Sequence, residues 1–239
     1  MASLQHAVLE DLESARNYNA WIASLALEHM GDDPIEVGSG TGTYAALWLA
    51  AGLPRITASE VDPALVERLR LRFAEDPRVR VQAIDLRAPP TAEHSAVVAL
   101  NVLEHVDDDV AGLRALTRLV RAGGSVVVFV PAFPFALSRF DRAIGHYRRY
   151  TSATLRQSFE GAGLGVDHLR YINSLGLLAW FVGMRLLRMT PRDGLLLRMW
   201  DRLVIPVVRT VERRAAPPFG QSLVAVGRVA ATPRARASG

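Results

Sequence analysis

Apolar and polar positions alternate with two different periods along most of this chain. Short apolar runs, typical of buried strands, recur between longer segments with the three- and four-residue apolar spacing of helices. The pattern predicts strands at residues 34–37, 55–60, 79–84, 96–101, 125–131, 165–172 and 221–227. It predicts helices at residues 4–30, 43–51, 63–75, 108–121 and 152–162. This alternation favours an α/β fold, a doubly wound, mostly parallel seven-stranded sheet with helices on both faces.

The first strand runs into a glycine-rich turn, with Gly38-Ser39-Gly40-Thr41-Gly42 followed by a helix. Turns of this kind let backbone N–H groups approach a ligand closely, because glycine has no Cβ. The dinucleotide fingerprint requires a glycine where Thr43 stands, and the chain has no lysine for a Walker-type phosphate loop. Glu36 places a carboxylate at the end of the strand, which suits a cationic ligand better than a pyrophosphate.

Three further landmarks follow this motif in order. Residues 36–42 are followed by a strand that ends in Glu60, a strand that ends in Asp85, and a strand that runs into Leu103-Glu104-His105-Val106. In this order they resemble the motifs of the class I S-adenosylmethionine (SAM)-dependent methyltransferases, over residues 16–172. The resemblance implies a Rossmann-like domain over residues 1–230 that binds SAM and releases S-adenosylhomocysteine.

In open sheets of this kind, ligands bind beyond the carboxyl ends of the strands, where the strand order reverses. Glu60 is suited to accept hydrogen bonds from both ribose hydroxyls. Asp85 can accept one from the adenine amino group, and the Leu86 N–H can donate one to an adenine ring nitrogen. Glu36 would act through loop N–H groups or water, and Asn101 and Val102 through their carbonyls. The full set of predicted cofactor-binding residues is Tyr18, Glu36, Gly38, Ser39, Gly40, Gly42, Glu60, Val61, Asp85, Leu86, Asn101 and Val102.

The segments outside the SAM-binding core (residues 32–172) have predictions of their own. In the family that the chain resembles, helices such as residues 1–31 fold over the cofactor, and Tyr18 is the candidate to reach the methionine carboxylate, with Arg16 second. The alternative is that Tyr18 and Trp21 only pack this helix onto the core. Residues 231–239, rich in Ala, Arg, Pro, Ser and Gly, are predicted to be a disordered tail.

Glu104 and His105 raise the question of a metal. Quinone-pathway O-methyltransferases can bind one through Glu-x-x-Glu-His at this place, but Asn101 replaces the first carboxylate. Two plausible ligands are too few for a tight divalent site. The sequence therefore predicts no metal, with both residues shaping the turn and His105 contacting substrate.

Residues 132–150 form a long aromatic and charged loop after the fifth strand, predicted to be a lid. The end of this loop resembles a signature of one small-molecule branch of these methyltransferases, a branch whose substrates are not assigned: Gly145-His146-Tyr147-Arg148-Arg149-Tyr150-Thr151. Methyl transfer chiefly requires that the nucleophile, the methyl carbon and the sulfur are held in a line. An O or N nucleophile that must be deprotonated also requires a nearby base. His146 is the candidate base, with Tyr147 orienting it and Asp141 as the alternative base. The competing interpretation is that His146, Arg148 and Arg149 only brace the lid.

Residues 173–216 depart from a minimal methyltransferase and are predicted to be an apolar and basic helical insertion before the last strand (221–230). The apolar run 175–184 is too short to span a bilayer, which needs about 20 residues. Four roles stay open: packing on the sheet, lying on a membrane interface, forming a homodimer, or walling a lipophilic substrate.

Charge and composition limit the function classes. Residues 1–171 carry 17 Arg and 21 acids, whereas residues 172–239 carry 11 Arg and 3 acids, so anionic partners are expected near the second part. The absence of cysteine and of a signal-peptide pattern fits a cytoplasmic protein. The leading hypothesis is a methyltransferase acting on an O, N or C nucleophile of a small, lipophilic or acidic molecule. A nucleic-acid methyltransferase is the alternative, although no nucleic-acid-binding module is recognised. A SAM-binding protein that does not methylate is a third.

Overall fold

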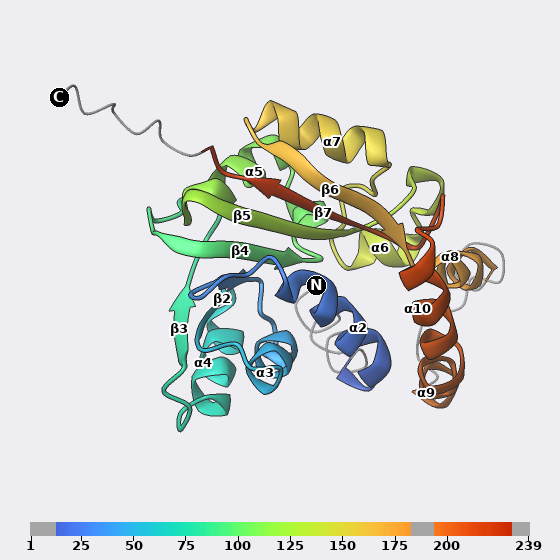
Figure 1. Cartoon of the computed structure of the whole chain (residues 1–239), viewed down its shortest axis with the longest axis horizontal. Helices are drawn as coiled ribbons and strands as arrows, with labels where there is room; N and C mark the ends of the chain where they lie inside the picture. The colour runs from blue at the N-terminus through green and yellow to red at the C-terminus, as the bar shows by residue number, and fades with distance from the viewer. Residues whose placement is uncertain (1–12, 183–193, 231–239) are drawn as a thin grey trace.

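A twisted sheet runs through the middle of the structure, a computed structural model that describes residues 13–182 and 194–230 (Figure 1). Its seven strands follow the order β3-β2-β1-β4-β5-β7-β6. Neighbouring strands from β3 to β5 pair in parallel, and β7 pairs antiparallel with both β5 and β6. The strand bounds are β1 (Ile35–Val37), β2 (Ile56–Glu60), β3 (Val79–Ala83), β4 (His94–Leu100), β5 (Val120–Pro131), β6 (Gly165–Ile172) and β7 (Ser222–Arg228). The predicted seven-stranded, mostly parallel α/β sheet is confirmed.

The sheet separates two hydrophobic cores, because successive side chains of a strand point to opposite faces. In β4, Val98 and Leu100 belong to one core, and Val97 and Ala99 to the other. Since both faces are covered, every residue of β4 is buried. Helices on both faces therefore complete the doubly wound architecture.

The first core contains residues of α2, α3, α4 and α10. The second contains residues of α5 and α7. The bounds of these helices are α2 (Arg16–Leu27), α3 (Thr43–Ala50), α4 (Pro63–Arg72), α5 (Asp109–Thr117), α7 (Ser152–Gly161) and α10 (Ile205–Arg214). Side-chain caps fix the starts of two helices: Asp62 accepts from Ala64 N at the start of α4, and Thr151 from Thr154 N at the start of α7.

Strand β5 begins earlier than the sequence pattern predicts. The pattern places residues 122–124 in a turn before a strand at 125, whereas β5 already starts at Val120, so α5 ends at Thr117. Gly123 keeps a left-handed φ of 79° inside this stretch, and its N–H donates to Val229 O. Pairing with His94 and with residue 229 thus extends the strand through the two glycines.

The described parts of the insertion before the last strand are helical, as predicted, and comprise α8 (Ser174–Trp180), α9 (Gly194–Leu203) and α10. Residues 183–193 of the predicted insertion lie outside the described residues. These helices gather at one end of the sheet (Figure 1). Two buried acids hold these helices in place. Asp201 of α9 accepts the backbone N–H of Tyr18 on α2. Glu212 of α10 accepts from the N–H groups of Asn173 and Ser174 at the start of α8. The predictions for residues 4–12 and for the tail 231–239 lie outside the described residues.

Candidate functional site

The glycine turn after β1 has the conformation that its sequence requires. Gly38, Gly40 and Gly42 all have left-handed φ values, of 73°, 54° and 82°. A Cβ on Gly38 would lie 2.5 Å from Val102 Cγ2, so close approach of the two loops also demands glycine there. The turn leads directly into α3, whose N-terminal residue is Thr43. The glycine turn therefore lies beside the carboxyl end of β1, at the position where such turns bring the backbone close to a ligand.

Glu60 closes this turn from the end of β2. Its Oε2 accepts the N–H of Gly40 at 3.0 Å, and its Oε1 accepts the N–H of Val61 at 2.8 Å. A carboxylate has about four lone-pair sites, so each oxygen keeps capacity for one more donor. A ribose with two vicinal hydroxyls supplies two such donors. Glu60 therefore fits its predicted role in both position and hydrogen-bonding capacity.

Glu36 is buried below the turn, and its Oε2 has no hydrogen-bond partner among the described residues. Burial raises the pKa of Glu36 to about 8, a rise that the Ser39 hydrogen bond opposes and nearby Glu60 increases. With one oxygen unpartnered and a second carboxylate nearby, Glu36 would be ionised more readily if a cationic ligand bound beside it. SAM, which carries a sulfonium and an α-amino group, has this charge.

A large cavity of about 1400 Å³ opens at the carboxyl ends of the strands, where the order reverses between β1 and β4. The predicted site residues that line it are Tyr18, Gly38, Ser39, Gly40, Glu60, Val61, Asp85, Leu86, Asn101, Val102, His105, Asp141, His146 and Tyr147. Glu36 and Gly42 are not among the lining residues. Glu36 lies beneath the turn, in keeping with its predicted indirect role. Gly42 packs against Leu69 of α4 and against Phe73, which follows the last residue of α4.

Two predicted cofactor residues have partners within the protein. Asp85 accepts from Arg87 Nη2 at 2.7 Å, and this hydrogen bond holds the pKa of Asp85 below its ordinary value. An adenine amino group would therefore share this carboxylate with Arg87. Tyr18 lines the cavity, and burial raises the pKa of its phenol to about 12, a rise that a side-chain hydrogen bond with Ser222 opposes. Tyr18 thus stays a neutral donor at physiological pH.

The lid, residues 132–150, is built around a buried carboxylate. Asp141 accepts from Arg149 Nη2 at 2.7 Å and Ser138 Oγ at 2.6 Å, and its Oδ1 lies 3.1 Å from His146 Nδ1. Burial acts to raise the pKa of Asp141, but the His146 hydrogen bond, the Arg149 charge and the Ser138 hydrogen bonds together hold it well below its ordinary range. Asp141 is therefore an ionised anchor for the imidazole of His146.

This geometry changes two of the predicted roles. The partner of His146 is Asp141, whereas the Tyr147 side chain is 58% exposed and its backbone N–H donates to Glu104 O. A carboxylate that is held ionised by three neighbours is also a poor base. Asp141 thus takes the orienting position predicted for Tyr147. Arg148 and Arg149 brace the lid, since Arg148 pairs with Asp109 at 3.4 Å.

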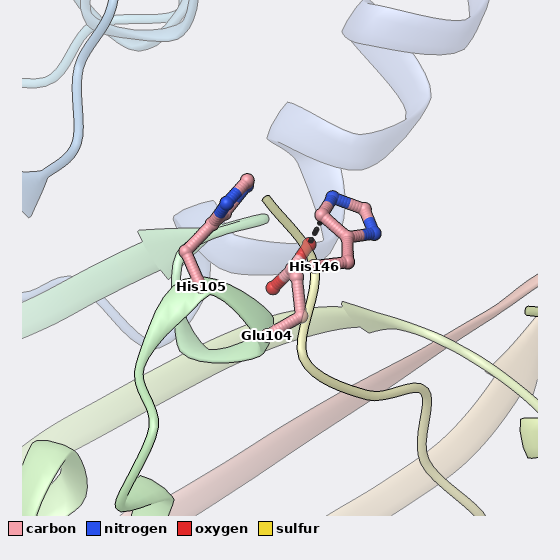
Figure 2. Close-up of side chains that lie close together, drawn as sticks. All are labelled: Glu104, His105 and His146. Atoms are coloured by element: carbon pink, nitrogen blue, oxygen red, sulfur yellow. Dashed lines mark ion pairs between the residues drawn. The ribbon is translucent and has the colours of Figure 1, made fainter. Parts of the chain in front are cut away.

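Glu104, His105 and His146 meet beside this anchor, with the two imidazoles on either side of the carboxylate (Figure 2). His146 Nε2 lies 3.8 Å from Glu104 Oε1, and the two imidazole centroids are 4.6 Å apart. Burial raises the pKa of Glu104 to about 8, and burial and the charge of His146 lower that of His105 to about 4. The three groups each offer a ligand atom within 4.8 Å of the others, a spacing that a metal ion could use. The prediction of no metal counted two ligands, and the lid supplies this third.

Another wall of the cavity is apolar and comes from the lid and from the insertion, whose four open roles include walling a lipophilic substrate. Trp180 of α8 stacks under the Arg149 guanidinium at 4.7 Å and meets Phe140 edge-on at 6.0 Å. Leu196, Leu197 and Trp200 of α9 line the same cavity. Aromatic residues in the lid and insertion are a signal for such a wall, but only the fold shows which of them face the site.

Comparison with known proteins agrees with this fold. A methyltransferase domain family matches residues 35–126. A ubiquinone biosynthesis O-methyltransferase of Xanthomonas oryzae is 35% identical over 107 residues, 43% of this chain and 44% of that protein. A protein of Mycolicibacterium smegmatis, described as an S-adenosylmethionine-dependent methyltransferase, is 30% identical over 168 residues, 68% of this chain and 63% of that protein. The chain thus matches less than half the length of the Xanthomonas relative.

Two solved structures share the architecture at low sequence identity. The methyltransferase in a Haloferax volcanii complex with the Trm112 methyltransferase activator has a TM-score of 0.64 at 21% identity, covering 94% of this chain and 96% of the other. A geranyl diphosphate methyltransferase in complex with SAM has a TM-score of 0.62 at 15% identity, covering 89% and 85%. Together with the strand order and the matched domain, these likenesses show that the chain has the α/β fold of the class I methyltransferases.

Proposed function

We propose that this protein transfers the methyl group of SAM to an O or N nucleophile of a small, lipophilic acceptor, with His146 as the general base. The observation that carries the proposal is the shared cavity. The glycine turn and Glu60 line one part of it, and the Asp141–His146 pair lines another. SAM supplies an electrophilic methyl group when it is bound. The residues of this chain then have to hold the acceptor in line and accept its proton.

The proton chemistry follows from the contacts of His146. With the Asp141 carboxylate ionised, Nδ1–H of His146 donates to it, which leaves Nε2 as the acceptor for a proton. When the acceptor's O–H or N–H proton moves to Nε2, the resulting imidazolium lies between the carboxylate of Asp141 and the carboxyl group of Glu104. These two groups stabilise the charge that forms as the new bond to the methyl carbon is made and the bond to sulfur breaks. His105, whose pKa of about 4 keeps it neutral, can form a hydrogen bond with the methyl-accepting molecule as either donor or acceptor.

The cavity supports a lipophilic acceptor. Its volume of about 1400 Å³ exceeds the 300–1,000 Å³ typical of small-ligand sites, so it can hold an acceptor beside the cofactor. Trp180, Leu196 and Trp200 form an apolar wall within it. The guanidinium of Arg149 lies over the Trp180 ring of this wall, and its charge is paired with the carboxylate of Asp141. Two of the similar proteins are named for ubiquinone biosynthesis and for geranyl diphosphate, which fits an acceptor with a long apolar portion.

The proposal is tested by transfer of a radiolabelled methyl group from SAM to a panel of hydroxylated and amino-bearing amphiphiles. The wild type should label at least one acceptor, and His146→Ala should lower kcat by about 10²- to 10⁴-fold while SAM binding, measured by calorimetry, stays unchanged. His168→Ala, an exposed histidine on β6, is the matched control and should retain full activity.

Two results would overturn the assignment of His146 as a base. The first is full activity in His146→Ala. The second is loss of wild-type activity in EDTA that is restored by a divalent cation, since Glu104, His105 and His146 would then act as metal ligands. Activity that persists in EDTA is expected.

A further inference from the structure

An exposed apolar stripe follows the two helices α9 and α10. The helices join end to end, because Val204 N donates to Trp200 O at 2.8 Å and Val208 N donates to Val204 O at 3.0 Å. Large apolar side chains that are at least half exposed recur along this joined helix at Leu196, Met199, Leu203, Val207 and Val211. They are spaced by three or four residues, so they lie on one side of the helix.

The inner face of the joined helix is already occupied by contacts with the rest of the chain. Ile205 and Val208 are buried in the core that contains α2 and α3. Asp201 and Glu212, the two acids of α9 and α10, are buried and accept backbone N–H groups of α2 and α8. The exposed stripe is therefore a second apolar face, separate from the one that holds these helices on the domain.

Arginines accompany the stripe. The five arginines of the two helices are Arg198, Arg202, Arg209, Arg213 and Arg214. In the part of the chain that the structure describes, none of them pairs with a carboxylate. The outer side of the joined helix therefore combines exposed apolar side chains with uncompensated positive charge.

A small polar pocket lies on the same helix. It has a volume of about 250 Å³, and Asn17, Thr210, Arg209 and Arg213 contribute to its walls. The Nε of Arg209 is buried there without a hydrogen-bond partner among the described residues. Burial and the neighbouring Arg213 both lower the pKa of Arg209, because no anion in the described structure offsets the two charges. An anionic group of phosphate size would satisfy both guanidinium groups.

We propose that α9 and α10 dock this protein on an anionic phospholipid surface. The apolar stripe would enter the acyl-chain boundary, and the arginines, with Arg209 and Arg213 in the polar pocket, would bind lipid phosphates. Among the described residues no helix is long and apolar enough to cross a bilayer, so the helix pair would lie in the interface plane. A second copy of the chain fits less well, because stripe-to-stripe packing would bring two uncompensated arginine rows together.

The cavity connects this surface to the reaction, a step that rests on the proposed function. Leu196 belongs to the exposed stripe and also lines the cavity, and Leu197 and Trp200 of the same helix line it too. An amphiphilic acceptor in the bilayer could therefore reach the site along α9 without passing through water.

Vesicle flotation tests the docking surface without any acceptor. The full chain should float with equimolar phosphatidylglycerol–phosphatidylcholine vesicles and not with phosphatidylcholine alone, and binding should weaken as ionic strength rises. Arg209→Gln/Arg213→Gln should lower the partition coefficient about 25-fold, from about five-fold per arginine at the surface. Leu203→Ser/Val207→Ser should lower it about ten-fold or more.

Leu71→Ser, at an apolar side chain on α4 that is 73% exposed, is the matched apolar control, and Arg156→Gln on α7 is the matched charge control. Both should float as the wild type does, and all variants should bind SAM with unchanged affinity. Failure of the wild type to float, or equal flotation of the test and control variants, would overturn the proposal. A dimer in light scattering that Leu203→Ser/Val207→Ser dissociates, without vesicle binding, would assign the stripe to a second copy instead. If the wild type floats with anionic vesicles but transfers no methyl group to any acceptor, only the proposed function is contradicted.

Discussion

The carboxylate of Asp201 on α9 accepts the backbone N–H of Tyr18 on α2 at 2.8 Å, across 183 positions of the chain. Its other oxygen accepts the N–H of Asn17 at 2.9 Å. Both donors lie in the first turn of α2, where N–H groups have no partner within the helix. One residue of the insertion thus caps the helix that carries Tyr18 into the cavity, and the position of α2 depends on α9.

Removal of this cap should loosen α2. Asp201→Ala is expected to lower the free energy of unfolding by about 1–2 kcal/mol, the usual cost of losing a side-chain cap, and to weaken SAM binding because Tyr18 is no longer held. Urea unfolding and calorimetry measure the two effects. Asp167→Ala, which removes only an exposed pair with Arg228, should change neither. Unchanged SAM affinity in Asp201→Ala would show that α2 is positioned by its apolar contacts alone.

Asp141 should act through His146 and not on the acceptor. Asp141→Asn keeps the size of the side chain but removes the charge that orients the imidazole and stabilises the imidazolium. We expect kcat to fall about 10²- to 10³-fold with little change in KM for SAM, and the pH–rate profile to shift. A purely structural role would lower the amount of folded protein and leave the profile of the remaining activity where it was. Asp167→Asn is the matched control.

Glu104 should make stability depend on pH. Its pKa is raised from 4.5 to about 8 in the folded protein, so the folded state holds a proton that the unfolded state releases between these values. Stability should therefore be highest below about pH 4.5 as far as this group is concerned, and should fall as the pH rises to about 8, by up to about 1.4 kcal/mol per pH unit. Glu104→Gln should flatten this fall, as followed by urea unfolding across the pH range. An identical slope in Glu104→Gln and wild type would mean that Glu104 is ionised in the fold.

Gly42 should be intolerant of a side chain for a reason other than cofactor contact. A Cβ there would lie 2.6 Å from Phe73 Cε2 and 2.8 Å from Leu69 Cδ2, in addition to the strain of φ 82°. Gly42→Ala should cost about 2–4 kcal/mol of stability. Gly52→Ala separates the two causes, because Gly52 has φ 98° but open space around it. Equal costs in the two variants would assign the whole effect to backbone strain.

The sequence predicts those parts of the fold that depend on neighbouring residues. The glycine turn, the acid at the end of β2 and the caps at Asp62 and Thr151 are all encoded within a few positions. The continuous apolar run 96–100 is likewise typical of a strand buried on both faces, as β4 is. Local patterns of this kind suffice for the sheet, the helices and the location of the cavity.

The rest depends on contacts between distant residues. The Asp201–Tyr18 cap and the contacts of Glu212 with the start of α8 join segments far apart in the chain, and no local pattern marks them. The partner of His146 is five residues away but is selected by the fold of the lid, in which Arg149 and Ser138 fix the carboxylate of Asp141. Adjacency in the sequence predicts Tyr147 as the partner of His146, whereas in the fold Asp141 accepts this contact and the Tyr147 side chain is 58% exposed.

The central claim is that SAM binds in the cavity that the glycine turn and Glu60 line. Calorimetric titration of SAM and S-adenosylhomocysteine into the wild type, Glu60→Ala and the exposed control Glu67→Ala tests it most directly. We predict micromolar binding to the wild type and Glu67→Ala, and at least about ten-fold weaker binding to Glu60→Ala, since two charge-assisted hydrogen bonds to the ribose are lost. Absence of binding to the folded wild type, or equal binding to all three proteins, would contradict the assignment of this cavity as the cofactor site.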